Sequence, residues 1–189
     1  MSYNSTSPCI NLNRRHFLHN LSYVAAAMVF PNLATATIKK NHSAKHLTFE
    51  NLHTGETLSA TYFENGRYVN GALKELNHIL RDHRSGDVFS MDPSLFDLLH
   101  EMQYQLGVKQ PIQIISGYRS PATNAQLQKE TFGVATKSLH MLGKAIDIRM
   151  EGVNSNVIKQ TAIAMQRGGV GYYPDSDFVH VDTGRVRHW

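Results

Sequence analysis

The sequence has little cysteine, little proline and no long apolar run. Its 189 residues, 41% of them hydrophobic, include six prolines and a single cysteine, Cys9. One cysteine cannot form an intramolecular disulfide, and Cys9 precedes the region expected to fold, so cysteine-based zinc ribbons, iron–sulfur clusters and thiol catalysis are excluded there. This composition and length fit one folded domain. No apolar run reaches the ~18–20 residues of a spanning helix, so we expect no integral membrane segment in the mature chain.

The first 36 residues have the pattern of an export signal. The pair Arg14-Arg15 precedes a moderately apolar stretch at residues 21–30 and a small-x-small cleavage pattern at residues 34–36. This order predicts a signal peptide over residues 1–36, and the adjacent arginines indicate the twin-arginine route. The alternative is an amphipathic first helix of the domain, although a proline and alternating small residues suit a helix poorly.

Removal of this segment changes what the charge of the chain implies. The net charge at pH 7 is +4, and residues 1–36 hold Arg14 and Arg15 but no acidic residue, so the remaining chain carries +2. That balance removes the main support for nucleic-acid binding. We therefore expect a periplasmic protein with a flexible lead-in over residues 37–45 and one domain over residues 46–189.

Hydrophobic periodicity predicts alternating strands and helices in that domain. We expect a hairpin at 46–63, helices at about 71–84, 92–106, from 121 and after 154, and strands at 112–115, 143–150, 170–173 and 177–184. Strict alternation in the 143–150 segment puts Ile146 and Ile148 on one face and Asp147 on the other. The element order indicates a single α+β domain, with a mainly antiparallel sheet and surrounding helices.

Two histidines and an aspartate stand out in the predicted core strands. His140 precedes Asp147 by seven residues, with Gly143 and Ala145 reducing the bulk between them, and His180 lies among apolar residues of another strand. A carboxylate in a core strand is costly unless it is paired or bound to metal. Two imidazoles and one carboxylate satisfy three positions of a tetrahedral zinc and leave the fourth for water. The sequence therefore predicts a zinc site on the sheet.

The same residues have other interpretations. His180 could be a hydrogen-bonded core histidine, and Asp147 could pair with Arg149 or Arg119. Two histidines and a carboxylate also form the iron-binding facial triad of some oxygenases.

A resemblance to the YcbK-like murein endopeptidases is carried by the stretches SGYRSPATN, SLHMLGKAIDIRM, GGVGYY and FVHVDTGRVRHW. These enzymes belong to the lysostaphin / D-Ala-D-Ala metallopeptidase / sonic hedgehog superfamily, and the resemblance covers most of residues 46–189. It implies a zinc peptidase that acts on peptidoglycan cross-links outside the cytoplasm, most specifically an LD-endopeptidase on diaminopimelate 3–3 bridges. By motif, it implies that His140, Asp147 and His180 hold the zinc.

The resemblance also suggests residues around the metal. Arg119 matches the arginine that related dipeptidases use near the oxyanion or the substrate, with a structural salt bridge as the alternative. Ser138 is its less certain companion in substrate binding, and it could equally be a loop-capping hydroxyl.

Two residues compete for the role of general base. Asp177 stands three residues before His180, where the dipeptidases carry a glutamate, but a regular strand would put it on the face opposite His180. His188 offers an imidazole that titrates near neutral pH, unless it is simply an exposed tail residue. We prefer His188 by a small margin.

Substrate preference is the least readable property. Arg149, Arg185 and Arg187 cluster in sequence near the site and could bind the carboxylates of diaminopimelate. A D,D-carboxypeptidase and a 4–3 endopeptidase remain alternatives. So does a non-catalytic, zinc-stabilised module that binds peptidoglycan, although the presence of Arg119, Asp177 and His188 favours an enzyme.

Overall fold

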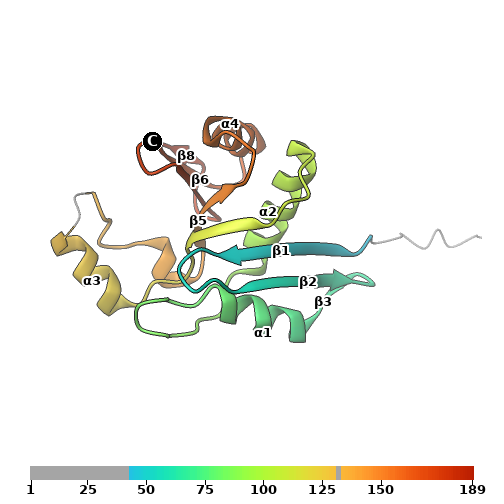
Figure 1. The fold of residues 1–189 in the computed structure, drawn as a ribbon, viewed down its shortest axis with the longest axis horizontal. Coiled ribbons are helices and arrows are strands. Elements are labelled where there is room, and N and C mark those ends of the chain that lie inside the picture. The colour runs from blue at the N-terminus through green and yellow to red at the C-terminus, as the bar shows by residue number, and fades with distance from the viewer. Residues whose placement is uncertain (1–42, 131–132) are drawn as a thin grey trace, which may run out of the picture. The chain divides into compact units, whose positions relative to one another are not determined.

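The computed structural model describes residues 43–130 and 133–189 (Figure 1). The predicted signal at residues 1–36 and most of the predicted lead-in lie outside the described residues. The first strand begins at Lys45, the last residue of that lead-in. Within the described ranges, no helix is long and apolar enough to cross a membrane.

An eight-stranded sheet forms the centre of the domain, in the order β3-β2-β1-β4-β5-β7-β6-β8. Its pairs are antiparallel except for β1–β4 and β6–β8, which are parallel. The expectation of a single α+β domain with a mainly antiparallel sheet is confirmed. The strands are β1 Lys45–Asn51, β2 Thr57–Glu64, β3 Arg67–Tyr68, β4 Ile112–Ser116, β5 Ala145–Met150, β6 Gly169–Tyr173, β7 Phe178–Asp182 and β8 Arg187–His188.

Within the described residues, four α-helices and one short 3₁₀ helix accompany the sheet; the α-helices are labelled in Figure 1. The best predicted is α2, where Asp92 caps the first turn by accepting from the Ser94 amide at 2.9 Å and Gly107 ends it in the left-handed conformation. The helices are α1 Asn70–Ile79, α2 Pro93–Leu106, α3 Pro121–Glu130, η1 Leu139–Leu142 and α4 Ser155–Met165.

Two boundaries differ from the prediction. Helix α1 ends at Ile79 rather than near residue 84, because Asp82 accepts backbone hydrogen bonds that organise the following residues into a turn. The strand expected from residue 143 begins at Ala145, because the residues before it form η1, which Gly143 closes with φ +65°. His140 therefore lies on a 3₁₀ turn that leads into β5.

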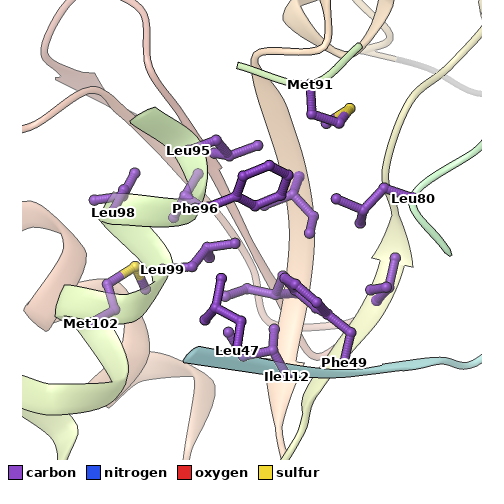
Figure 2. Packing of buried hydrophobic residues seen from close by; sticks show 14 of the residues in the cluster. Leu47, Phe49, Leu80, Met91, Leu95, Phe96, Leu98, Leu99, Met102 and Ile112 are labelled. Atoms are coloured by element: carbon purple, nitrogen blue, oxygen red, sulfur yellow. The ribbon is translucent and has the colours of Figure 1, made fainter. Parts of the chain in front are cut away.

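The hydrophobic core packs α2 against the sheet (Figure 2). Leu95, Phe96 and Leu99 of α2 are fully buried together with Leu47 of β1 and Ile112 of β4.

Strands β5 and β7 separate the core from the site. Ile146 and Ile148 of β5 and Val179 and Val181 of β7 are also fully buried in the core. Because side chains alternate along a strand, the residues between these four project from the other face of the sheet.

Candidate metal centre

Three side chains converge on that other face. Asp147 of β5 is paired directly with His180 of β7 in the sheet register, and η1 brings His140 to them. All three are buried. His180 Nδ1 lies 2.8 Å from Asp147 Oδ1, and His140 Nε2 lies 3.1 Å from His180 Nδ1 and 3.2 Å from Asp147 Oδ1. The structure thus brings together the three residues predicted as metal ligands.

The spacing and the ring orientations fit a small cation. Ligand atoms about 2.0–2.1 Å from a tetrahedral zinc lie roughly 3.3 Å apart, close to the three separations here. The Nδ1–H of His140 donates to the Gly117 carbonyl at 2.7 Å, and the Nε2–H of His180 donates to Asp182 Oδ2 at 3.0 Å. In neutral rings the facing nitrogens therefore present lone pairs to each other and to the carboxylate. A bound cation is what satisfies three converging acceptors.

The electrostatics of the pocket favour positive charge at its centre. Burial alone would raise the pKa of Asp147, but the neighbouring His140 and His180 hold it well below its usual range. Burial alone would lower the pKa of His180, yet hydrogen bonds with Asp147 and Asp182 raise it to about 9. Positive charge is therefore favoured beside His180, and a metal ion and a proton would compete for this position.

Asp182 is a functional residue that the sequence analysis did not single out. Its carboxylate is fully buried and, besides His180, it accepts from Arg187 Nη2 at 2.7 Å, the Gly184 amide at 2.8 Å and the Gly169 amide at 3.0 Å. Such an outer carboxylate fixes the tautomer and orientation of a metal-binding histidine. The H-x-D spacing on β7 was the signal, since residues two apart on a strand share a face.

The SGYRS loop supports the site and brings Arg119 to it. Arg119 Nη2 lies 3.7 Å from Asp147 Oδ2 and 3.4 Å from Ser116 Oγ. Gly117 lets the loop pass against the Leu80 carbonyl, because any Cβ at this position would collide with that oxygen. Burial lowers the pKa of Arg119, and the nearby Asp147 opposes that change. The guanidinium is thus desolvated beside the metal ligands.

Ser138 has a structural contact. It is the N-cap of η1, and its hydroxyl accepts from the His140 amide at 3.4 Å. This is the loop-capping alternative considered for it, and its role in substrate binding stays a prediction.

The residue before β7 lies outside the regular strand. Asp177 has φ +48°, and β7 begins only at Phe178, so strand alternation does not determine where Asp177 points. Its carboxylate, 63% exposed, lies 4.0 Å from Arg149 Nη1. Arg149 projects from the same face as Asp147, which brings Asp177 to the side of the sheet that carries the site.

His188 lies on the opposite side of the sheet. In β8 it pairs with the core residue Val170, whereas the next residue, Trp189, bonds to the backbone of β6 on either side of Gly171. A Cβ at Gly171 would approach the Trp189 ring to 2.7 Å, and that ring lies 5.3 Å from the His180 ring. Because neighbouring residues alternate faces, Trp189 covers the site and His188 points away from it. The geometry therefore does not support the preference for His188.

A buried cluster of two histidines and an aspartate on the sheet of an α+β domain is the arrangement expected of a metallopeptidase. The chain belongs to the peptidoglycan L,D-endopeptidase MepK family, whose model matches residues 39–189. It is 45% identical over 177 residues to the peptidoglycan L,D-endopeptidase MepK of Escherichia coli (strain K12), covering 94% of this chain and 97% of that protein. It is 39% identical over 181 residues to the probable peptidoglycan L,D-endopeptidase MepK of Haemophilus influenzae, covering 95% and 97%. The resemblance noted in the sequence is confirmed.

Proposed function

We propose that this protein is a zinc-dependent L,D-endopeptidase that hydrolyses the peptide cross-links of peptidoglycan. The observation that carries the proposal is the cluster of His140, Asp147 and His180, whose facing atoms lie within 3.2 Å of one another in a chain of the MepK family. These three residues would hold the zinc. When bound, the metal supplies a water of lowered pKa and polarises the scissile carbonyl.

Arg119 stabilises the negative charge that develops on the carbonyl oxygen during attack. Its guanidinium is 14% exposed and already lies 3.7 Å from Asp147, so it needs no large rearrangement to face the reacting carbonyl. A fixed cation in a desolvated site is worth more to a developing oxyanion than the same cation in water.

Asp177 acts as the general base in this proposal. It accepts a proton from the attacking water and returns it to the leaving amine. Its left-handed backbone and its distance of 4.0 Å from Arg149 Nη1 support this role, since Arg149 projects from the face that holds the metal ligands. His188 is the second candidate, and its position opposite Val170 argues against it.

Digestion of purified muropeptides tests the proposal. The protein should cleave 3–3 cross-linked dimers and leave 4–3 dimers intact, as followed by mass spectrometry. Chelation should stop the cleavage, added zinc should restore it, and His140→Ala should remain inactive under all conditions. Release of terminal D-alanine alone would instead indicate a D,D-carboxypeptidase, and binding without cleavage would indicate a non-catalytic module.

The substrate implies that the protein acts in the cell envelope. We propose that it reaches the periplasm by the twin-arginine route, which the pair Arg14-Arg15 supports. Changing both residues to lysine should leave a precursor in the cytoplasm, as detected by fractionation and immunoblotting. Unchanged delivery to the periplasm would contradict this route.

A further inference from the structure

We infer that Arg149, beside the stacked rings of Tyr173 and Phe178, forms a subsite for the free carboxylate that diaminopimelate carries next to the scissile bond. This inference rests on the proposed function and names the side chain that selects the substrate. In a 3–3 bridge, that carboxylate is attached to the carbon that bears the scissile nitrogen. The subsite would make the enzyme prefer free over amidated diaminopimelate.

The sheet register brings Arg149 next to the metal ligands. Asp147 pairs with His180, and Ile148 pairs with Val179. One residue further along this antiparallel ladder, Arg149 lies across from Phe178. Phe178 in turn pairs with Tyr173. Arg149, Phe178 and Tyr173 therefore form a row across the sheet. On the same face, this row lies next to the row that contains Asp147 and His180, called here the ligand row. A substrate bound at the ligands would therefore extend over Arg149.

The guanidinium of Arg149 is only weakly engaged by the rest of the protein. Among residues 43–130 and 133–189, the buried side-chain nitrogen and oxygen atoms that lack a hydrogen-bond partner are Arg119 Nε and Arg149 Nε. The remaining polar contacts of the Arg149 guanidinium are long, at 3.4 Å to the Ser176 carbonyl and 4.0 Å to Asp177. A guanidinium has five N–H donors in a planar fork that matches a carboxylate. An incoming carboxylate would bind the Nη groups of this partly exposed side chain, whose contacts within the protein are long.

Two stacked aromatic rings, those of Tyr173 and Phe178, form an aromatic wall in the same row as Arg149. The rings of Tyr173 and Phe178 stack with centroids 4.5 Å apart and planes 17° apart. Trp189 fixes this wall by donating from Nε1 to the Tyr173 hydroxyl at 3.0 Å. The methylene chain of diaminopimelate can pack on such a surface while its carboxylate reaches the guanidinium.

The other two arginines considered from the sequence do not offer this arrangement. Both Nη atoms of Arg187 are engaged by the buried Asp182, at 3.1 and 2.7 Å. Arg185 is exposed in the segment between β7 and β8. Of the three, Arg149 combines a place beside the ligand row with a guanidinium whose contacts within the protein are long.

Steady-state kinetics on a pair of 3–3 cross-linked dimers tests the inference, one dimer with free and one with amidated diaminopimelate carboxylates. The wild-type protein should prefer the free form. Arg149→Gln should lower kcat/KM for that form about 10–100-fold, mainly through KM, because a charge-assisted hydrogen-bonded pair is lost. The amidated form should be affected far less. Arg149→Lys should retain part of the preference.

Arg67→Gln is the matched control, since it removes one exposed arginine from β3 at the opposite edge of the sheet and should change neither rate. The melting temperature of each variant checks that it folds. Equal losses on both dimers would mean that Arg149 only positions Asp177, and no loss would mean that it contacts neither substrate. Either result overturns the inference.

A binding measurement separates this inference from the proposed function. A tripeptide that ends in diaminopimelate is titrated into ¹⁵N-labelled protein while the Nε–H signal of Arg149 is followed by NMR. The signal should shift with the free carboxylate and not with its amide. If the wild type cleaves neither dimer, the proposed function fails while this shift can still support the subsite; the absence of the shift overturns the subsite.

Discussion

Two buried aspartates, Asp82 in the turn after α1 and Asp147 in β5, have opposite surroundings. Asp82 is 1% exposed and accepts hydrogen bonds from the Ser120 amide at 2.8 Å and the Arg84 amide at 2.9 Å. Asp147 is 6% exposed and faces two imidazoles that direct their fixed protons elsewhere. Both carboxylates have a pKa below the usual range despite burial. A lowered pKa alone therefore does not distinguish a structural carboxylate from a ligand; the neighbouring atoms do.

The two regions are nevertheless mechanically linked. The Ser120 amide that binds Asp82 belongs to the loop whose Gly117 carbonyl orients His140. Asp82 thus positions the loop, and the loop positions His140, a candidate metal ligand. The variants below separate these two roles, beginning with the largest expected effect.

Asp147→Asn should remove the metal and nearly all activity. An amide is a weaker ligand than a carboxylate, and the change removes the negative charge that lies between the two imidazoles. We expect cleavage of 3–3 dimers to fall by about 10³-fold or more, since the metal provides both the nucleophile and the polarisation. Metal content by mass spectrometry and the melting temperature check the result. Undiminished stoichiometric zinc in a folded Asp147→Asn protein would contradict the ligand assignment.

Asp177→Asn should affect proton transfer and spare the metal. Loss of a general base lowers kcat by about 10²–10⁴-fold. Asparagine tolerates the left-handed conformation of this position, so the turn should survive the change. His188→Ala is the control, because that side chain lies opposite the core residue Val170, and it should turn over at a near-normal rate with zinc retained. An inactive, zinc-loaded His188→Ala beside an active Asp177→Asn would reverse the assignment.

Asp182→Asn tests the second carboxylate that binds His180. The asparagine side chain has only one oxygen that accepts hydrogen bonds. It also lacks the negative charge that pairs with Arg187 at 2.7 Å in the wild type. Outer-shell substitutions of this kind weaken metal affinity about 10–100-fold, which competition with a zinc-binding dye can measure. The isosteric change should leave the sheet folded. Zinc affinity equal to wild type would show that His180 needs no orienting partner.

The sequence predicted the members of the candidate metal site because Asp147 and His180 follow strand periodicity. Asp147 and His180 each lie between strongly apolar residues of a strand. This alternation can be recognised in the sequence without knowing how the strands pair. The small residues Gly143 and Ala145, between His140 and Asp147, completed the pattern. The motif resemblance then reduced the alternatives to a zinc peptidase.

The proposed base and the proposed substrate subsite depend on geometry that periodicity does not contain. Asp177 reaches the site face because of its φ of +48°, a conformation that non-glycine residues adopt infrequently. His188 points away because β8 joins the sheet in parallel beside β6, a long-range pairing of two residues. Arg149 stands out only through its unpartnered Nε and the long contacts of its Nη atoms. Each of these depends on three-dimensional contacts and not on local spacing.

Asp82→Asn should give the smallest effect at the metal and a clear effect on stability. The amide places N–H groups against backbone donors, so we expect the free energy of unfolding to fall by about 1–3 kcal/mol in urea titrations. Burial would raise the pKa of Asp82, but hydrogen bonds from Thr123, Ser120 and Arg84 lower it below the unfolded value. The stabilisation by the wild-type carboxylate is therefore full above the unfolded pKa of ~3.9 and is lost as the pH falls below it.

The difference in stability between wild type and Asp82→Asn should accordingly be constant near neutral pH and shrink below about pH 4, because asparagine does not titrate. Zinc affinity at neutral pH should stay within about threefold of wild type, since a buried carboxylate saturated by backbone donors contributes to the site only through the loop. If Asp82→Asn instead weakened zinc binding as strongly as Asp182→Asn, the turn after α1 would belong to the metal site itself. The hydrogen-bond donors around Asp82 and the imidazole acceptors around Asp147 would then no longer distinguish a structural carboxylate from a metal ligand.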